Sequence, residues 1–417
     1  MRVLVLDGNE NQAVAAVRSL GALGHDVYVG SDSSWSKAGL SRWSKGSFTY
    51  ESPQNGAGKF IDRIVEELRG HGPTLVLPMT ERATIPLSER RDQIRDAGGL
   101  LILPAHEFVL AAFDKRQTTE LARSLGIAVP ATRIISNRLE GEEYARAAAY
   151  PLVLKPRSSE EVLPDGRVIS TGAPRYAKNQ TEFMMACDEI LKRSSALLAQ
   201  EFIEGKGAGY FALMRRGELR AEFAHRRIRD VRPTGSGSAV RESISPDPAM
   251  REAALKILRA LSWHGVAMVE FRQKADGTPV FLEVNGRFWN SLALAIYSGV
   301  DFPSLLAEVA QGRDFEPLHD YRLNVRCRWL LGDFRHLLEV MRGAPAGYPG
   351  KFPRRWQTLV QFLTPMRGMF HDNFSVRDPL PEFGDWIDFI FRKLPKRLRL
   401  THKDVKVGDA ESRYSLS

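Results

Sequence analysis

The stretch from Val269 to Ser291, VEFRQKADGTPVFLEVNGRFWNS, predicts a β-hairpin that carries acidic side chains. Two alternating apolar runs flank Asp276-Gly277, a pair typical of a two-residue type I′ turn. Counting outward along both strands from this turn places Glu270 directly opposite Glu283. We therefore expect two carboxylates to face each other across one ladder.

The alternation along this hairpin separates a core face from a polar face. The core face contains Val269, Phe271, Leu282 and Val284, and the polar face contains Met268, Glu270, Arg272, Phe281, Glu283 and Asn285. Opposed like charges are destabilising unless a cation lies between them. Two carboxylates and an amide, with room for phosphate and water oxygens, suit Mg²⁺. A solvated face with Arg272 as the counter-charge is the alternative that the hairpin alone leaves open.

Length and composition indicate an ordinary globular protein of two or three domains. The chain has 417 residues, of which 43% are hydrophobic and 26% charged. Its two cysteines, Cys187 and Cys327, lack metal-ligand spacing, so we expect neither a zinc site nor a disulfide framework. The first apolar run is too short to cross a bilayer and precedes no cleavage site. We expect no export and a cytoplasmic location.

The net charge of +9 is concentrated in part near the C-terminus. The run FRKLPKRLRLTHK, Phe391 to Lys403, follows DWIDFI. Such a segment could provide peripheral membrane contact through residues 386–403 as an amphipathic helix. A terminal helix packed on its domain with snorkelling basic side chains is the interpretation we favour, because Pro395 interrupts any long helix. We expect no nucleic-acid partner.

Residues 1–105 alternate strand-like and helix-like segments, which predicts a parallel sheet wrapped by helices. The first turn between strand and helix, DGNENQ, lacks the G-x-G-x-x-G pattern of a dinucleotide site. Further along, Lys115 follows a helix-capping aspartate and Lys155 ends a short buried strand. Another strand delivers the segment Gln200-Glu201-Phe202-Ile203. The residues after about 312 are rich in arginine, aromatic residues and proline, and their fold is not predicted.

Taken in order, these segments and the acidic hairpin resemble the ATP-grasp superfamily, particularly its carboxylate-amine ligase branch. The resemblance covers roughly residues 1–311, and its most specific part is GVAMVEFRQ…GTPVFLEVNGRFWNS, with the pattern E…E-x-N-x-R. It implies a mixed α/β and α+β architecture. A Rossmann-like pre-ATP-grasp domain would span residues 1–105 and a two-part ATP-grasp domain 106–311, with a lid at about 150–200. Residues 312–417 would form a C-terminal extension.

The resemblance implies ATP and Mg²⁺, with Mn²⁺ as an alternative metal. Lys115 and Lys155 would contact ATP phosphates, and Gln200, Glu201, Phe202 and Ile203 would line the adenine slot. Glu270, Glu283 and Asn285 would bind the metal ion. No acidic residue follows Glu204 closely enough to match the ribose-binding acid of several relatives, so the ribose contact is not predicted.

Three arginines complete the implied site. Arg287 would reach a transferring phosphoryl group or the substrate carboxylate, and its alternative role is a salt bridge at a strand end. His225, Arg226 and Arg227 precede the loop VRPTGSGSAVRES, whose backbone amides could hold an anion. Arg226 or Arg227 would stabilise the reacting groups, and strand alternation should direct only one of them inward.

The implied activity is an ATP-dependent C–N ligase that joins a small-molecule carboxylate to an amine through an acyl phosphate. Two alternatives remain open: an ATP-grasp kinase or carboxylase-type enzyme, and a non-catalytic ATP-binding scaffold. The sequence identifies neither substrate, and it is compatible with a homo-oligomer.

Overall fold

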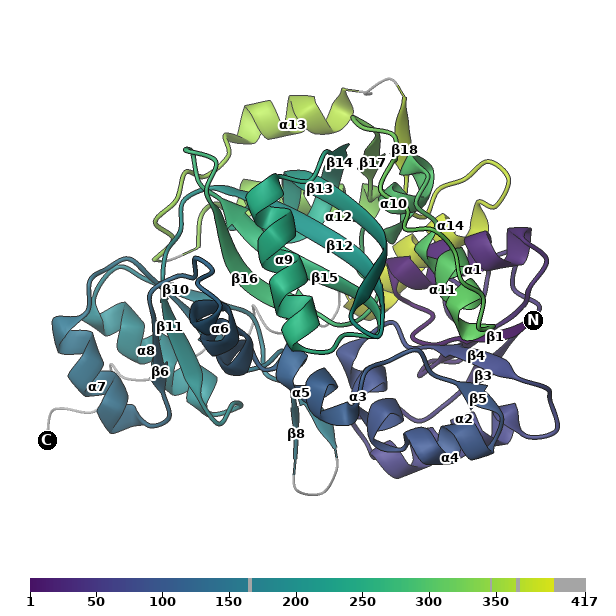
Figure 1. Ribbon diagram of the computed structural model, residues 1–417. Coiled ribbons are helices and arrows are strands. Elements are labelled where there is room, and N and C mark those ends of the chain that lie inside the picture. The colour runs from purple at the N-terminus through teal and green to yellow at the C-terminus, as the bar shows by residue number, and fades with distance from the viewer. Residues whose placement is uncertain (164–166, 346, 365–367, 394–417) are drawn as a thin grey trace, which may run out of the picture.

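The computed structural model describes residues 1–163, 167–345, 347–364 and 368–393. Within these residues the strands form a five-stranded, a four-stranded, a seven-stranded and a two-stranded sheet. Figure 1 shows the five-stranded sheet and the four-stranded sheet on different sides of the large central sheet. The predicted mixed α/β organisation with a parallel N-terminal sheet is confirmed.

The N-terminal sheet is parallel and has the order β3-β2-β1-β4-β5. Its strands are β1 (Arg2–Val5), β2 (Asp26–Ser31), β3 (Gly46–Thr49), β4 (Thr74–Leu77) and β5 (Gly99–Leu100), and its helices are α1 (Asn11–Ala22), α2 (Ala57–Leu68), α3 (Glu81–Glu89) and α4 (Arg91–Asp96). Helix α2 buries Phe60, Ile61, Ile64 and Leu68, whose spacing gives it one apolar face. Short connections between strand and helix keep the sheet parallel.

The four-stranded sheet is the core of a separate lobe. Its strands are β6 (Thr132–Ile135), β7 (Leu152–Pro156), β10 (Arg175–Ala177) and β11 (Leu197–Glu201), and its helices are α7 (Arg138–Ala147) and α8 (Gln180–Leu191). The lobe begins before residue 150, where we placed the start of the lid. Its first strand, β6, pairs with β11, with Ile135 opposite Leu197. Strands β8 (Glu160–Val162) and β9 (Val168–Ser170) form a small hairpin outside the four-stranded sheet.

The seven-stranded sheet has the order β16-β15-β12-β13-β14-β17-β18. Its strands are β12 (Lys206–Arg215), β13 (Glu218–Arg232), β14 (Ser236–Ile244), β15 (Gly265–Gln273), β16 (Pro279–Asn285), β17 (Arg326–Arg328) and β18 (Met369–His371). Helices α5 (His106–Phe113), α6 (Lys115–Ser124) and α9 (Pro248–Ala260) cover one face. Helices α10 (Leu292–Ser298) and α11 (Phe302–Ala310), together with α1, cover the other. Alternation along β12 supplies both faces, with Tyr210 on the first and Phe211 on the second.

The residues after 312 continue this sheet, which the sequence did not predict. Strand β17 pairs with β14, with Arg328 opposite Val240, and β18 adds a parallel edge strand. Each of these two strands has only three residues, too few to show an alternating pattern. The remaining elements are α12 (Leu330–Arg342), α13 (Arg355–Leu363), α14 (Leu380–Asp388) and a π-helical turn, η1 (Phe389–Lys393).

No single described helix is long and apolar enough to cross a membrane. Helices α10 and α11 reach that length and apolar character only as a pair, and a 90° bend separates them. Both helices are packed in the core shared by the central sheet and α1. Of the predicted membrane-contact segment 386–403, residues 394–403 lie outside the described residues.

Candidate functional site

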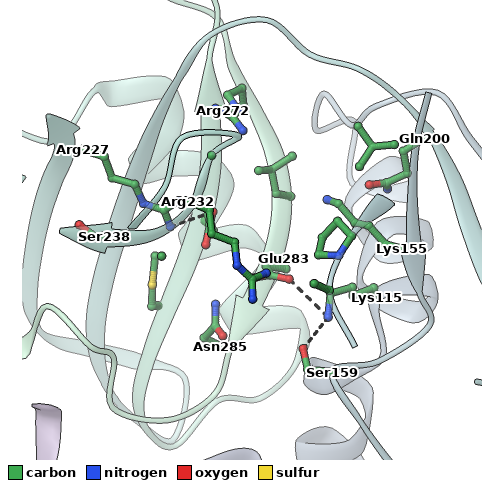
Figure 2. A pocket seen from close by; sticks show the side chains of 18 of the residues that line it. Lys115, Lys155, Ser159, Gln200, Arg227, Arg232, Ser238, Arg272, Glu283 and Asn285 are labelled. Atoms are coloured by element: carbon green, nitrogen blue, oxygen red, sulfur yellow. Dashed lines mark hydrogen bonds and ion pairs between the residues drawn. The ribbon is translucent and has the colours of Figure 1, made fainter. Parts of the chain in front are cut away.

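A cavity of about 560 Å³ lies between the four-stranded lobe and the central sheet (Figure 2). Its volume is within the range of ordinary ligand pockets, about 300–1,000 Å³. Eleven of the twelve predicted site residues line it: Lys115, Lys155, Gln200, Glu201, Phe202, Ile203, Arg227, Glu270, Glu283, Asn285 and Arg287. The twelfth predicted site residue, Arg226, does not line the cavity. Residues distant in sequence therefore meet at one cavity.

The predicted pairing of Glu270 with Glu283 is present, but the predicted turn is wrong. Three residues, 275–277, connect Lys274 to Thr278, whose carbonyl accepts a 3.0 Å hydrogen bond from the Lys274 amide. Of the predicted turn pair only Gly277 has a positive φ, 90°, whereas a type I′ turn requires two such residues. The ladder is therefore displaced by one residue near the turn.

A β-bulge restores the pairing between the two acids. Phe271 pairs with Phe281 and Glu270 pairs with Glu283, so Leu282 is the additional residue. As a result, Phe281 and Leu282 exchange the faces that we predicted for them: Phe281 is buried in the core, and Leu282 lines the cavity. The two displacements cancel at Glu270 and leave both carboxylates at the cavity.

Lys115 and Lys155 reach the cavity from the side opposite the central sheet, as Figure 2 shows. Asp114 caps α6 by accepting hydrogen bonds from the amides of Arg116 and Gln117, which fixes Lys115 in the first helical position. The Lys115 Nζ donates to Ser159 Oγ at 2.9 Å and lies 3.4 Å from Glu283 Oε2. Lys155 is on β7, where Leu152 and Leu154 face the lobe core and alternation directs Lys155 to the cavity.

The pKa values of this cluster reflect burial and the opposed charges. Burial lowers the pKa of Lys155, and the nearby Glu283 carboxylate opposes that effect. Burial alone would raise the pKa of Glu283, but Lys115 and Lys155 lower it below its usual value. The Glu283 carboxylate is consequently ionised at neutral pH, when it carries the negative charge that a metal ligand requires.

The structure distinguishes the two neighbouring arginines of β13. The Arg227 guanidinium lies 2.8 Å from Glu270 and 3.5 Å from Asp230. Gly207 on β12 leaves room for it, because an added Cβ would lie 2.8 Å from Arg227 Cδ. Burial by itself would lower the pKa of Arg227, but Glu270 and Asp230 raise it overall. Arg227 is therefore a permanently charged part of the cavity wall.

Of the two arginines, Arg226 does not line the cavity, which agrees with the expectation that only one of them points inward. Its side chain is about half exposed and pairs with Glu242 on the neighbouring strand β14. Arg326 of β17 pairs with the same carboxylate at 2.8 Å. The reason is the strand alternation that sends Arg227 inward and Arg226 to the other face.

Arg287 lies beside Asn285 at the end of β16. Its guanidinium donates to Asn285 Oδ1 at 3.1 Å and to the Phe288 carbonyl at 2.9 Å. It also lies 3.6 Å from the Glu81 carboxylate, which comes from the N-terminal domain. The side chain thus makes a salt bridge and reaches the cavity at the same time, so the two predicted roles do not exclude each other.

The oxygen atoms of Glu270, Glu283 and Asn285 suit a hard divalent cation. The two carboxylates pair across one ladder and share the cavity with the amide. Within the described residues, no group of three or more His, Cys, Asp and Glu side chains could hold a metal ion by itself. The three side chains therefore fit Mg²⁺ only with additional oxygens from phosphate or water, which is how Mg²⁺ is usually bound.

An apolar region of the cavity lies around the strand connection after β11. Val153, Ile203 and Leu282 contribute to its walls. The side chains of Gln200 and Glu201 bond to the segment before β6: Gln200 Nε2 donates to Thr132 Oγ1 at 3.1 Å, and Glu201 Oε2 accepts from the Ala131 amide at 3.3 Å. These contacts fix the strand edge against which a planar base could pack.

Phe202 packs against two tyrosines, of which Tyr176 also lines the cavity. Its ring contacts Tyr176 and Tyr348 edge to face, at centroid distances of 6.2 and 6.0 Å. Tyr176 belongs to β10 of the lobe, and Tyr348 follows α12. The chain after residue 312 thus supports the apolar end of the cavity, a contact that no sequence pattern indicated.

Three further polar residues line the cavity and have buried atoms without a hydrogen-bond partner among the described residues: His225 Nε2, Ser238 Oγ and Trp289 Nε1. Burial lowers the pKa of His225 well below its usual value, and Arg227 and Arg241 add to the effect, so this imidazole is neutral. We noted His225 in the sequence beside the two arginines. Ser238 and Trp289 gave no recognisable signal, because neither belongs to a spaced pattern of polar residues.

Known proteins resemble this chain in sequence and in fold. A family model described as "ATP-grasp in the biosynthetic pathway with Ter operon" matches residues 193–332. The carbamoyl phosphate synthase large chain of Methanoculleus marisnigri is 24% identical over 255 residues, which cover 55% of this chain and 23% of that protein. The chain therefore spans about a quarter of the length of this curated relative.

Two solved structures share the fold at low sequence identity. The biotin carboxylase domain of 2-oxoglutarate carboxylase from Hydrogenobacter thermophilus, solved with MgADP, ADP and bicarbonate, has a TM-score of 0.59 and 18% identity, covering 78% of this chain and 73% of that domain. The L-amino acid ligase of Bacillus licheniformis has a TM-score of 0.56 and 16% identity, covering 74% of each chain.

Proposed function

Because this chain belongs to the ATP-grasp superfamily, we propose that it is an ATP-dependent ligase that joins a small-molecule carboxylate to an amine. The observation that carries the proposal is the arrangement of opposite charges around one cavity. Lys115 and Lys155 lie on one side, Glu270 and Glu283 on the other, and Arg287 beside them. Phosphoryl transfer depends mainly on this kind of positioning and charge neutralisation.

We place the ATP base at the apolar end of the cavity and its phosphates between the two lysines and the acidic hairpin. Leu282 and Ile203 line the apolar end. The ammonium groups of Lys115 and Lys155 would hold phosphate oxygens as point charges. When bound at Glu270, Glu283 and Asn285, Mg²⁺ would neutralise the charge of the phosphates and orient them.

In the first step, an oxygen of the substrate carboxylate attacks the γ-phosphorus. The new P–O bond forms while the bond to the leaving oxygen of ADP breaks, giving an acyl phosphate and ADP. Arg287 would hold the carboxylate or the transferring group, since its guanidinium lies beside Asn285 and is fixed by the Phe288 carbonyl. A guanidinium recognises the planar geometry of either group.

In the second step, an amine attacks the acyl carbon. The C–N bond forms, the C–O bond to phosphate breaks, inorganic phosphate leaves, and the amine gives up its proton to solvent or to the departing phosphate. Arg227, which Glu270 holds at 2.8 Å, would stabilise the negative charge that develops during this displacement. Closure of the lobe would keep water from the acyl phosphate.

A carboxylase-type reaction is the second candidate. The likeness in fold extends to a biotin carboxylase domain that was solved with bicarbonate. Bicarbonate would take the place of the organic carboxylate, and the product of the first step would be a carboxyphosphate. The nucleophile that then attacks carbon distinguishes the two reactions.

Oxygen-isotope transfer tests the proposal directly. The full chain is incubated with ATP, Mg²⁺, pooled amines and a library of carboxylates labelled with ¹⁸O, and a parallel reaction contains labelled bicarbonate. We expect one ¹⁸O atom in the released phosphate for each amide formed, because the carboxylate oxygen that attacks phosphorus leaves with phosphate. The Glu283→Gln variant is the control, since it keeps the shape of the side chain and removes the charge.

Each other outcome contradicts the ligase. Label transfer only from bicarbonate favours the carboxylase-type reaction. ADP release with a stable phosphorylated product and no amide indicates a kinase. Tight binding of ATP, with no ADP formed in the presence of any carboxylate of the library, indicates a non-catalytic scaffold.

A further inference from the structure

A second cavity adjoins the candidate active site. Its volume is about 570 Å³, close to that of the first. Three parts of the chain line it: the lobe, through α8 and β10, the turn between β13 and β14, and the end of α12 with the residues that follow. The reaction proposed above assigns no group to this space.

The two cavities share one wall. The residues that line both of them are Ala173, Pro174, Tyr176 and Arg232. The Tyr176 hydroxyl donates to the Thr234 carbonyl at 3.0 Å, so this shared wall joins the lobe to the turn between β13 and β14. A molecule in the second cavity would therefore lie directly beside the occupant of the first.

The shared wall begins close to the part of the first cavity where we place the phosphates. Thr171 donates from its amide and from its hydroxyl to the Ser159 carbonyl, each at 3.1 Å. The Ser159 hydroxyl accepts from Lys115, which lies 3.4 Å from Glu283. Ala173 follows Thr171 by two residues, a span of at most about 7 Å. The second cavity therefore has access to the place where the acyl phosphate would form.

Apolar side chains supply much of the surface of the second cavity. Beyond the shared wall they are Met185 and Ala186 of α8, Pro233 of the turn, and Pro345 and Phe352 after α12. A concave site with apolar walls binds the apolar part of a small molecule. Burial of such a part raises affinity by about three- to fourfold for each methylene group.

The acidic side chains that line the second cavity are already paired. Each has a partner among the described residues: Glu182 the amide of Lys178, Glu189 the guanidinium of Arg175, and Glu339 that of Arg342. Arg232, in the shared wall, forms no ion pair with a described residue, and Figure 2 shows it on the other side of the first cavity from Lys155. A positive charge beside an amine favours its neutral form, which is the nucleophilic one. The site therefore suits an amine that is held by its apolar part.

We propose that the second cavity binds the apolar body of the amine substrate and presents its nitrogen to the acyl phosphate across the shared wall. The role of this amine as the nucleophile rests on the proposed ligase, whereas its binding requires no turnover. During attack the C–N bond forms, the C–O bond to phosphate breaks, and the nitrogen releases one proton to solvent or to the departing phosphate. The substrate class is accordingly an amine with an aliphatic or aromatic group of several carbon atoms, not ammonia.

Calorimetric binding of n-alkylamines to the full chain without nucleotide tests the site. We expect the affinity to rise by about tenfold or more from ethylamine to hexylamine, because the longer chain buries more methylene groups. Met185→Trp should lower the affinity for hexylamine by about fivefold or more, because the larger ring would extend into the cavity. Phe352→Ala should lower it to a similar degree, because it removes part of the apolar wall. Binding of ethylamine should change by less than about twofold in both variants.

Matched controls separate this site from unspecific binding and from misfolding. Leu139→Trp places the same ring at an exposed leucine of α7, on the same lobe, and should bind hexylamine like the parent. Thermal unfolding of Met185→Trp should match the parent, because the Met185 side chain is 71% exposed. Equal affinities for ethylamine and hexylamine, or an equal loss of binding in the control variant, would overturn the proposal.

Amide formation distinguishes failure of this site from failure of the ligase. With a carboxylate that the enzyme accepts, Met185→Trp should raise the KM for hexylamine by about fivefold or more and leave the KM for ATP within about twofold. Amide formation from ammonia as readily as from hexylamine would overturn the inference and leave the ligase standing. Binding that depends on chain length, without any amide, would contradict the ligase and support the cavity as an amine site.

Discussion

Glu270 and Glu283 are directly opposed on neighbouring strands, and each interacts with a cation from a different element. Arg227 of β13 lies 2.8 Å from Glu270, and Lys115 of α6 lies 3.4 Å from Glu283. The two acids are therefore held together by cations that themselves line the cavity. A ligand that brings phosphate and Mg²⁺ would give new partners to both acids and to both cations. Ligand binding would therefore change the ion pairs that hold the site together.

Removing the charge of either acid should abolish most of the activity. We expect Glu270→Gln and Glu283→Gln each to lower kcat by about 100-fold or more, because loss of a metal ligand costs several kcal/mol and about 1.4 kcal/mol is tenfold in rate. Steady-state ADP release measures the effect. Glu218→Gln, at the exposed first residue of β13, is the control and should match the parent. Activity of Glu283→Gln within threefold of the parent would contradict this role of the hairpin.

The neighbouring arginines of β13 provide a matched pair. Arg227→Gln should lower kcat/KM by about 100- to 1,000-fold, the usual effect of losing a donor that stabilises developing charge. Arg226→Gln should change kcat/KM by less than about threefold, because Arg326 still pairs with Glu242. Thermal unfolding of both variants separates catalysis from stability. Comparable losses of activity in the two variants, at unchanged stability, would show that the alternation of side chains along β13 does not decide which arginine acts in the site.

The acidic hairpin illustrates which parts of the site a sequence can predict. The facing of Glu270 and Glu283 was predicted correctly although the turn was not, because a three-residue turn and the bulge at Leu282 displace the register in opposite directions. An alternating pattern contains no signal for a bulge, so Phe281 and Leu282 were assigned to the wrong faces. Had the two displacements acted in the same direction, Glu270 and Glu283 would not lie opposite each other.

Contacts distant in sequence were the part that could not be predicted. Alternation indicated that one of Arg226 and Arg227 faces inward, but only the pairing of β13 with β12 and β14 decides which. The support of Phe202 by Tyr348 likewise depends on where the chain returns after α12. The parallel N-terminal sheet was predictable because short buried apolar runs, such as β1 and β4, alternate there with helical segments such as α2, which has one apolar face.

The exchanged faces of Phe281 and Leu282 give two adjacent variants with different effects. Leu282→Ala should raise the KM for ATP by about five- to fiftyfold, because it removes apolar surface from the cavity wall, while thermal stability changes little. Phe281→Ala should lower the free energy of unfolding by about 3–5 kcal/mol, because the ring is fully buried. Calorimetry of unfolding and ATP titration measure the two effects. The reverse assignment of effects would support the faces predicted from alternation alone.

Glu160 should make the stability of the protein depend on pH. Its carboxylate lies 3.5 Å from Arg82, and one of its oxygens is buried without a hydrogen-bond partner among the described residues. Burial raises the pKa of Glu160 to about 7, from 4.5 in the unfolded chain, although Arg82 opposes the effect. The folded state thus binds a proton that the unfolded state releases, so the stabilisation is fully present below pH 4.5 and is lost as the pH rises through 7.

The variant Glu160→Gln isolates this contribution, because Glu382, whose pKa burial also raises to about 7, remains in both proteins. We expect the free energy of unfolding of the parent, minus that of the variant, to fall by up to about 3 kcal/mol between pH 4.5 and pH 7.5, since one pKa unit corresponds to about 1.4 kcal/mol. Denaturant titrations across this range measure the difference. A difference that stays constant or rises with pH would mean that the Glu160 carboxylate is solvated or tightly paired in the folded protein.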